Sequence, residues 1–273
     1  MKSLNGRELA EFIKERQAQQ VRALRQAGHV VPKLAIVVTI EHPVINVYMR
    51  MKQKYGADLL IETEIHRIKQ SEAAETIKQL NADPSVHGII VQLPLENPAE
   101  TEGIVNLVAS EKDVDGLGEH PEFDPATPMA ILWLLAGYNV DLRGKHVLLV
   151  GRGKLVGQPL ERMLQASDID VSVADRSTKD LKAETLQADV IITATGSPAI
   201  LYPDMIKEGA VVVDAGVAGE EGKTVGDVAP EVYERDDLQI TPPKGGVGPL
   251  TVCALFDNVI RAARRVAEAK TQA

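Results

Sequence analysis

An aromatic ring and an amine lie one helical turn apart in the first third of the chain. Tyr48 and Lys52 are four residues apart within a stretch of helical periodicity, so their side chains stack on one face of the predicted helix. Lys54 lies on a different face of that helix. The ring and the amine can therefore converge on one ligand, although such a pair is more often a plain surface contact.

A glutamine interrupts an apolar strand at its carboxyl end. In VQLPL, residues 91–95, Gln92 follows the buried-strand pattern GIIV and is itself followed closely by Pro94. A buried amide needs hydrogen-bond partners, and the ligands of open α/β sheets bind beyond the carboxyl ends of the strands. Gln92 is therefore a candidate for ligand contact.

Two further segments have patterns that suit ligand contact. KDVDG, residues 112–116, puts Lys112, Asp113 and Asp115 on a turn, where an aspartate more often bonds its own backbone than a substrate. TPPKGGVGPLT, residues 241–251, combines three glycines with flanking prolines before the last helix. That shape suits backbone contact with a ligand, and it suits a plain interdomain loop as well.

A glycine-rich turn follows an apolar strand in VLLVGRGKLVGQP. Gly151 can make the tight turn, Gly153 can let a phosphate approach the backbone, and Gly157 allows close packing of helix on strand. The unpaired N–H groups of the helix then face the anion. The spacing is one residue longer than the commonest fingerprint, but strand, turn and helix come in the required order. We therefore interpret it as a dinucleotide site rather than a tight turn alone.

The next strand ends in Asp175, Arg176, Ser177 and Thr178, where a Rossmann protein binds the adenosine ribose. A carboxylate there accepts hydrogen bonds from the ribose hydroxyls of NAD, whereas Arg176, helped by Arg152, would neutralise the 2′-phosphate of NADP. The two arginines favour NADP over NAD. The alternative is that Arg176 is merely solvated and Asp175 caps a turn.

The elements that must position these residues alternate between helix and strand in the first half of the chain. The periodicity predicts helices at 4–24, 44–55, 73–80 and 99–108, and strands at 34–40, 59–65 and 88–95. This alternation predicts a largely parallel sheet. The loop EKDVDGLGEHPEFDPATP, rich in Gly, Pro and Asp, is a natural edge of a first domain.

A second series of elements starts at Thr127. A helix leads into the strand that ends at the glycine-rich turn, and a helix at 157–166 and strands at 170–175, 190–195, 211–216 and just before 241–243 follow. We expect a two-domain α/β protein, an N-terminal α/β catalytic lobe plus a Rossmann-type doubly wound parallel sheet. The predicted domains are 1–126 together with a returning C-terminal helix at 252–273, and 127–251.

Composition excludes several classes of function. The net charge of −9 argues against general binding to a nucleic-acid backbone. Cys253 is the only cysteine and the six histidines lack one-turn spacing, so we expect no disulfide and no multi-cysteine or histidine metal site. No segment approaches the roughly 18 apolar residues of a membrane span, and the amino terminus lacks the continuous apolar stretch of a signal peptide. We expect a cytoplasmic protein without membrane or nucleic-acid partners.

Taken together and in this order, the segments resemble the bifunctional methylenetetrahydrofolate dehydrogenase/methenyltetrahydrofolate cyclohydrolase family over nearly the whole chain. The resemblance rests on Tyr48-x-x-x-Lys52, VQLPL at 91–95, KDVDG at 112–116, ATP at 126–128, VGRGKLVGQP at 150–159 and GGVGPLT at 245–251. It implies oxidation of 5,10-methylenetetrahydrofolate with NADP and hydrolysis of the 5,10-methenyl product to 10-formyltetrahydrofolate. It also implies a homodimer that acts in one-carbon metabolism and purine biosynthesis.

The resemblance also implies roles for individual residues. Tyr48 would pack on the pterin, Lys52 would act as general acid/base held by Gln92, and Asp115 would hold the pterin ring. Further substrate contacts are expected from Val91, Leu93, Gly245, Gly246, Gly248 and Pro249. Cofactor contacts are expected from Gly151, Arg152, Gly153, Val156, Gly157, Arg176, Ser177 and Val217.

Four positions depart from the family pattern. Ile45 and Gly153 stand where serine is usual, and Pro243 and Lys244 alter the loop before the glycines. A dehydrogenase with impaired cyclohydrolase is therefore one alternative, and a catalytically silent dinucleotide-binding protein is another. A shikimate or amino-acid dehydrogenase on a similar plan is a further rival, against which VQLPL and GGVGP argue.

Overall fold

A computed structural model describes residues 2–220 and 223–272. Its backbone divides into two compact α/β units. The three-stranded unit comprises Phe12–Ala126 and Val252–Ala273, and the Rossmann unit comprises Met1–Glu11 and Thr127–Thr251. The predicted two-domain α/β fold is confirmed.

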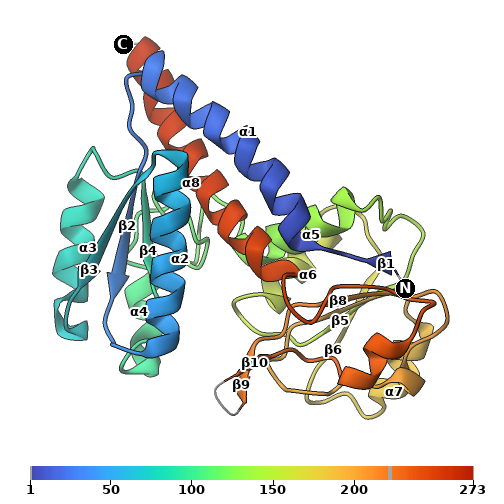
Figure 1. The fold of residues 1–273 in the computed structure, drawn as a ribbon. Helices are drawn as coiled ribbons and strands as arrows, with labels where there is room; N and C mark the ends of the chain where they lie inside the picture. The colour runs from blue at the N-terminus through green and yellow to red at the C-terminus, as the bar shows by residue number, and fades with distance from the viewer. Residues whose placement is uncertain (1, 221–222, 273) are drawn as a thin grey trace. The chain divides into compact units, whose positions relative to one another are not determined.

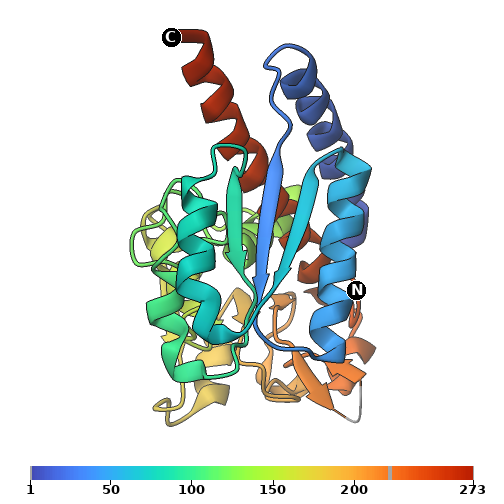
Figure 2. The same cartoon turned by 90° about the vertical axis from the view of Figure 1, so that its left-hand side faces the viewer.

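The three-stranded unit is built on a parallel sheet in the order β3-β2-β4 (Figure 2). Its elements are β2 (Lys33–Val38), α2 (Pro43–Leu59), β3 (Glu62–Arg67), α3 (Ala73–Ala82), β4 (Gly88–Val91) and α4 (Thr101–Val105). The central strand β2 is apolar and buried on both faces, as expected for a parallel strand covered by helices. Side chains of β2, β4, α3 and α4 share one core that includes Val37, Ile77 and Ile89.

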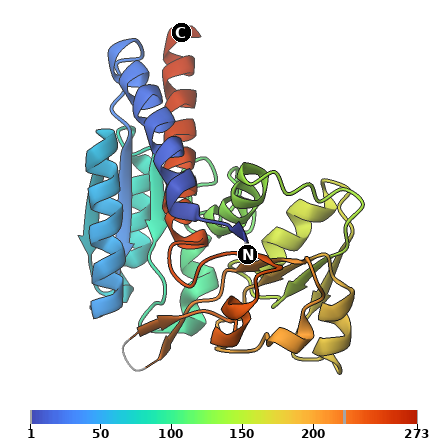
Figure 3. The same ribbon diagram turned by 45° about the vertical axis from the view of Figure 1, so that its right-hand side comes forward.

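Two long helices, α1 (Gly6–Gln26) and α8 (Val247–Gln272), run side by side where they belong to this unit (Figures 1 and 3). The Gln17 amide is fully buried, and its Nε2 donates to the carbonyl of Cys253 over 2.8 Å. Asn258 of α8 donates from Nδ2 to the carbonyls of Val114 and Asp124, both at 2.9 Å. The predicted packing of the C-terminal helix on the first lobe is confirmed.

The Rossmann unit contains a six-stranded parallel sheet in the order β1-β11-β8-β7-β5-β6. Its strands are β1 (Lys2–Ser3), β5 (Val147–Val150), β6 (Val171–Ala174), β7 (Val190–Thr193), β8 (Val211–Asp214) and β11 (Gln239–Ile240). Its further elements are α5 (Ala126–Gly137), α6 (Gly157–Gln165), α7 (Leu181–Gln187) and the hairpin β9 (Ala218–Glu220) and β10 (Lys223–Val225). Strand β6 lies on one side of β5 and the next strand, β7, lies on its other side. Doubly wound sheets bind dinucleotides at this change in strand order.

The first eleven residues group with the Rossmann unit rather than with the predicted first domain, 1–126. Lys2 and Ser3 form a strand that pairs in parallel with Gln239 and Ile240 of β11. Strand pairing between residues so distant in sequence leaves no local signal, so chain order alone assigned this segment to the first domain.

Most predicted elements end within a few residues of their observed bounds, and glycine or proline chemistry and local turns explain differences in three of them. The last helix begins at Val247 rather than at 252, because Pro249 lies in the first turn, where a missing N–H costs no helical hydrogen bond. The strand predicted at 88–95 ends at Val91, since Pro94 has no N–H to donate to a ladder. The helix predicted at 99–108 is a short 3₁₀ turn followed by α4, which ends at Val105.

Candidate active site

Lys52 and Gln92 meet at the carboxyl edge of the three-stranded sheet. The Lys52 ammonium donates from Nζ to Gln92 Oε1 over 2.9 Å. The amide of Gln92 donates in turn from Nε2 to the carbonyl of Leu93 over 2.8 Å, which fixes its oxygen toward the lysine. The sequence prediction of this pair as neighbours is confirmed, although the two residues are forty positions apart.

Main-chain pairing explains why these two side chains converge. Lys52 belongs to α2, the helix that follows the central strand β2, and Gln92 directly follows β4, the neighbour of β2. The backbone N–H of Gln92 donates to the carbonyl of Val37 over 2.9 Å. The backbone of Gln92 is thus anchored to the carboxyl end of the central strand, where ligand sites of such sheets form.

The site holds two half-buried groups of opposite charge, Lys52 and Asp115, each of which shifts the pKa of the other. Burial lowers the pKa of Lys52, and the charge of Asp115 opposes that shift. Burial raises the pKa of Asp115 to about 6, with Lys52 acting against the shift and Asp113 adding to it. An amine whose pKa is lowered toward neutrality can exchange protons with a ligand, which a freely solvated lysine does poorly.

The three charged residues of KDVDG have different environments. Lys112 donates from Nζ to the carbonyls of Leu80, Asn81 and Asp83, at 3.0, 2.8 and 2.7 Å, and so caps the C-terminal end of α3. Asp113 is buried and accepts hydrogen bonds from the N–H groups of residues 116 and 118. Their bonds are structural, which leaves Asp115 as the residue of this motif that acts on Lys52.

Tyr48 and Ile45 occupy opposite environments on α2. The ring of Tyr48 is 37% exposed and shares a helix face with Lys52, whereas Ile45 is 4% exposed and lies in the core. The isoleucine that stands in place of the usual serine is therefore a core residue. Val91 is also a core residue, at 3% exposure. Leu93 packs against the core that β2, β4, α3 and α4 share.

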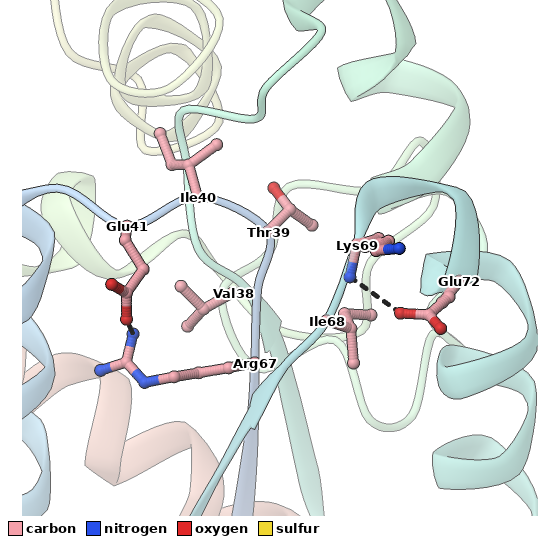
Figure 4. A pocket seen from close by; sticks show the side chains of 8 residues that line it. All are labelled: Val38, Thr39, Ile40, Glu41, Arg67, Ile68, Lys69 and Glu72. Atoms are coloured by element: carbon pink, nitrogen blue, oxygen red, sulfur yellow. Dashed lines mark hydrogen bonds and ion pairs between the residues drawn. The ribbon is translucent and has the colours of Figure 1, made fainter.

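A separate hollow of about 380 Å³ lies beyond β2 and β3 (Figure 4). Thr39 and Ile40 line it from the end of β2, and Arg67, Lys69 and Glu72 line it from β3 and the turn after it. Neither Lys52 nor Gln92 lines this hollow. Its lining includes two cationic and two anionic side chains, so it has no net charge to select an ionic ligand.

The glycine-rich segment before α8 lies in the Rossmann unit. Gly245 has φ +88°, a left-handed conformation that favours glycine, and its carbonyl accepts from the N–H of Arg7 over 3.1 Å. A Cβ on Gly6 would stand 1.8 Å from the carbonyl oxygen of Gly246. Gly248 and Pro249 belong to the first turn of α8 rather than to a loop.

The turn after β5 has the geometry of a phosphate-binding loop. Gly151 has φ +108°, and a Cβ there would stand 2.7 Å from the carbonyl oxygen of Ala194. A Cβ on Gly157 would stand 2.1 Å from the oxygen of Gly151, so only glycine permits this approach of helix to turn. Gly153 has open space around it. Val156 is the N-cap of α6, and the N–H of Gln158 in the first turn donates to the carbonyl of Gly153 over 3.0 Å. The positive end of the helix dipole at this turn suits a pyrophosphate.

The segment after β6 forms a compact turn. Asp175 accepts at Oδ1 from the backbone N and the Oγ of Ser177, at 2.8 and 2.6 Å. These bonds, with the charge of Arg152, lower the pKa of the Asp175 carboxyl. Arg152 pairs with Glu161 on α6, Nε to Oε2 at 3.1 Å. Arg176 is exposed on the same turn.

Two aspartates that the sequence analysis did not select organise the carboxyl ends of β7 and β8. Asp214 accepts from the N–H groups of residues 216, 227 and 228, and fully buried Asp227 accepts from the N–H of Thr195 over 2.7 Å. Burial raises the pKa of Asp227, and Asp214 adds to the shift. Val217, 60% exposed, follows this network directly. The D-A-G and G-D-V triplets were the available sequence signal, because each carboxylate lies against a glycine of the other triplet.

The described residues contain neither a cluster of metal-ligating side chains nor a membrane-spanning helix. Over residues 2–220 and 223–272, no group of three or more His, Cys, Asp or Glu side chains is placed to hold a metal ion. None of the helices within those ranges is long and apolar enough to cross a bilayer.

Comparison with known proteins gives one consistent match along the chain. The family "Tetrahydrofolate dehydrogenase/cyclohydrolase, catalytic domain" matches residues 4–115, and its partner "NAD(P)-binding domain" matches residues 125–267. The "Bifunctional protein FolD" of Moorella thermoacetica is 39% identical over 96% of this chain and 98% of that protein.

Solved structures agree with this match. The Campylobacter jejuni bifunctional enzyme FolD, a methylenetetrahydrofolate dehydrogenase/cyclohydrolase, superposes with a TM-score of 0.91 at 37% identity, covering 97% of this chain and 99% of that one. The Trypanosoma brucei enzyme, solved with NADP cofactor and an inhibitor, has a TM-score of 0.89 at 28% identity, covering 96% and 97%.

Proposed function

Because the chain belongs to the tetrahydrofolate dehydrogenase/cyclohydrolase family, we propose that it oxidises 5,10-methylenetetrahydrofolate with NADP and hydrolyses the 5,10-methenyl product to 10-formyltetrahydrofolate. The observation that carries this proposal is the Lys52–Gln92 hydrogen bond of 2.9 Å. It puts a partly buried amine, oriented by an amide, at the carboxyl edge of a parallel sheet. The family match sets aside the shikimate and amino-acid dehydrogenase readings.

In the oxidation, the protein binds and aligns the reactants. NADP supplies the hydride acceptor for the methylene carbon. The turn at Gly151 and Gly157 has the close backbone packing that admits a pyrophosphate. Tyr48 offers an exposed ring face to the pterin, and Asp115 offers a carboxyl group as a hydrogen-bond partner for its ring nitrogens. For the other substrate and cofactor residues, we propose the contacts that the family resemblance assigned to them.

In the hydrolysis, Lys52 manages the protons. Neutral Lys52 accepts a proton as water attacks the methenyl carbon, and it returns that proton to the folate nitrogen released when the ring opens. One further proton leaves to solvent, which balances the charge of the methenyl cation. Gln92 holds the amine in place between the two transfers. Burial favours the neutral amine that the first transfer requires.

A two-band absorbance assay tests the proposed function. Purified protein is mixed with methylenetetrahydrofolate and either NADP or NAD, and reduced nicotinamide and methenyltetrahydrofolate are followed together. We expect reduced NADP to appear without lasting methenyl accumulation. Lasting methenyl build-up would support the alternative of a dehydrogenase with impaired cyclohydrolase. Absence of any signal with either dinucleotide would contradict the proposal and favour a silent binder.

The assembly and cellular setting are also proposals. Strand β6 lies at an edge of the six-stranded sheet with Val171, Ser172 and Val173 half-buried, a surface suited to a second copy of the chain. We propose a cytoplasmic homodimer whose 10-formyl product supplies purine biosynthesis. Light scattering should give twice the 29.5 kDa chain mass, and a monomer mass at working concentrations would contradict the dimer.

A further inference from the structure

The end of the Rossmann unit where we expect the adenosine ribose carries two carboxylates, Glu161 and Asp175, beside the guanidinium of Arg152. Two chemistries compete at such a position. A 2′-phosphate needs a guanidinium and hydroxyl donors that are free to turn toward it, whereas an unmodified ribose diol needs a carboxylate acceptor. Which of them this chain favours depends on what Arg152, Ser177 and Asp175 already bind.

Arg152 is held at two points by Glu161. Nε of the guanidinium meets Oε2 at 3.1 Å, and Nη2 meets Oε1 at 3.3 Å. The glutamate is 15% exposed and the arginine 55%, so the carboxylate is the fixed partner and the guanidinium the accessible one. A 2′-phosphate must therefore compete with Glu161 for this arginine. Since ion pairs with an exposed partner are weak, a phosphate can displace the glutamate, at a loss of affinity.

Ser177 is engaged as well. Its hydroxyl donates to Oδ1 of Asp175 over 2.6 Å and its N–H donates to the same oxygen over 2.8 Å. Among the described residues, Oδ2 of Asp175 accepts no hydrogen bond. Asp175 lies at the end of β6 and is exposed, which leaves that oxygen available to the hydroxyls of a ribose.

We propose that Glu161 and Asp175 are specificity residues that make this chain accept both NADP and NAD. Glu161 lowers the affinity for the 2′-phosphate by occupying Arg152, and Asp175 raises the affinity for the ribose diol. This inference rests on the proposed dehydrogenase function, and it concerns the cofactor balance rather than the reaction.

Calorimetric titration with cofactor fragments tests this inference without folate. Wild type, Glu161→Gln and Glu184→Gln are each titrated with adenosine 2′,5′-bisphosphate and with adenosine 5′-monophosphate. Glu184 is a matched control, an exposed glutamate on α7 of the same unit. Glu161→Gln should bind the bisphosphate roughly fivefold to tenfold more tightly, as expected when a charge-assisted competitor is removed, with the monophosphate unchanged. Glu184→Gln should match wild type for both.

Asp175→Asn should shift the balance in the same direction from the other side, with weaker binding of NAD and tighter binding of NADP. An unchanged ratio of the two fragment affinities in Glu161→Gln would overturn the role of Glu161. Equal changes for NAD and NADP in Asp175→Asn would overturn the role of Asp175. The titrations contain no folate. A failed dehydrogenase assay would therefore contradict the proposed function without changing what these binding ratios mean.

Discussion

At the scale of single residues, the proposed chemistry depends on a half-buried lysine and a half-buried aspartate that shift the pKa of each other. Lys52 is held by Gln92 at 2.9 Å, and its charge opposes the burial that raises the pKa of Asp115. Each group makes the charged form of the other less costly. The pair is therefore poised to change protonation when a ligand adds or removes charge beside it.

The raised pKa of Asp115 predicts a pH-dependent stability cost. An aspartate ionises near 3.8 in the unfolded chain and at about 6 here, so the folded state holds the proton more tightly. The cost is absent below the unfolded value, grows as pH rises between the two values and is complete above about 6. Asp115→Asn should therefore raise the free energy of unfolding at pH 8 by up to about 3 kcal/mol, while weakening folate binding.

Urea unfolding of both proteins at pH 8 and pH 4 measures this effect. The gain of Asp115→Asn should shrink toward zero at the lower pH, because the wild-type carboxyl is then protonated in the folded state. A gain of equal size at both values would show that Asp115 carries no burial cost from its charge.

The sequence could identify the chemical residues without separating them from their structural neighbours. KDVDG contains three charged residues on one turn, and only the fold shows that Lys112 caps α3 while Asp113 bonds its own loop. Asp214 and Asp227 were missed for a related reason. Their partners are backbone N–H groups, several of them far along the chain, so the two Asp-Gly triplets were the only signal and did not show that the two carboxylates lie together.

At the scale of elements, the packing of α6 against the turn after β5 defines the dinucleotide loop. Gly157→Ala should destabilise it, because the new Cβ would stand 2.1 Å from the oxygen of Gly151 and 2.9 Å from the Cα of Arg152, both backbone atoms. We expect a loss of about 1–3 kcal/mol in unfolding free energy and strongly weakened NADP binding. Thermal unfolding with and without NADP measures both.

Gly153→Ser is the matched control for stability, since nothing lies within 4 Å of a Cβ at that position. It should unfold at the wild-type temperature. If both variants unfold alike, the close approach of α6 to the turn does not constrain the loop.

Periodicity predicted this strand, turn and helix well, because each step is local. It missed the first turn of the last helix, where glycine and proline are allowed at a helix start.

At the scale of the whole molecule, both ends of the chain are part of the folded units. The N-terminal strand completes the six-stranded sheet through β11, with Leu4 N–H donating to the carbonyl of Ile240 over 2.9 Å. The sequence predicted two α/β domains and the return of the C-terminal helix, because both follow from local periodicity and chain order. It could not assign the first residues, whose partners lie more than two hundred positions away.

Removal of residues 1–4 should therefore lower the unfolding temperature of the Rossmann unit. The deletion removes β1, one of the two strands that pair with β11, and takes away Leu4, which is fully buried, at a cost of about 2–5 kcal/mol. Calorimetric scans with and without NADP identify the affected unit, because NADP stabilises only the unit that binds it. A chain shortened instead after Glu268, next to residues 268–270 that are exposed, should unfold like the full protein, and an equal loss in both would contradict the stabilising role of β1.

The decay of methenyltetrahydrofolate absorbance in Lys52→Met and wild type tests the central claim most directly, with NADP affinity measured on the same samples. If Lys52 moves the protons of hydrolysis, the variant should hydrolyse about 100-fold more slowly or worse, while it stays folded and binds NADP as wild type does. A folded, NADP-binding variant that hydrolyses at the wild-type rate would contradict the account.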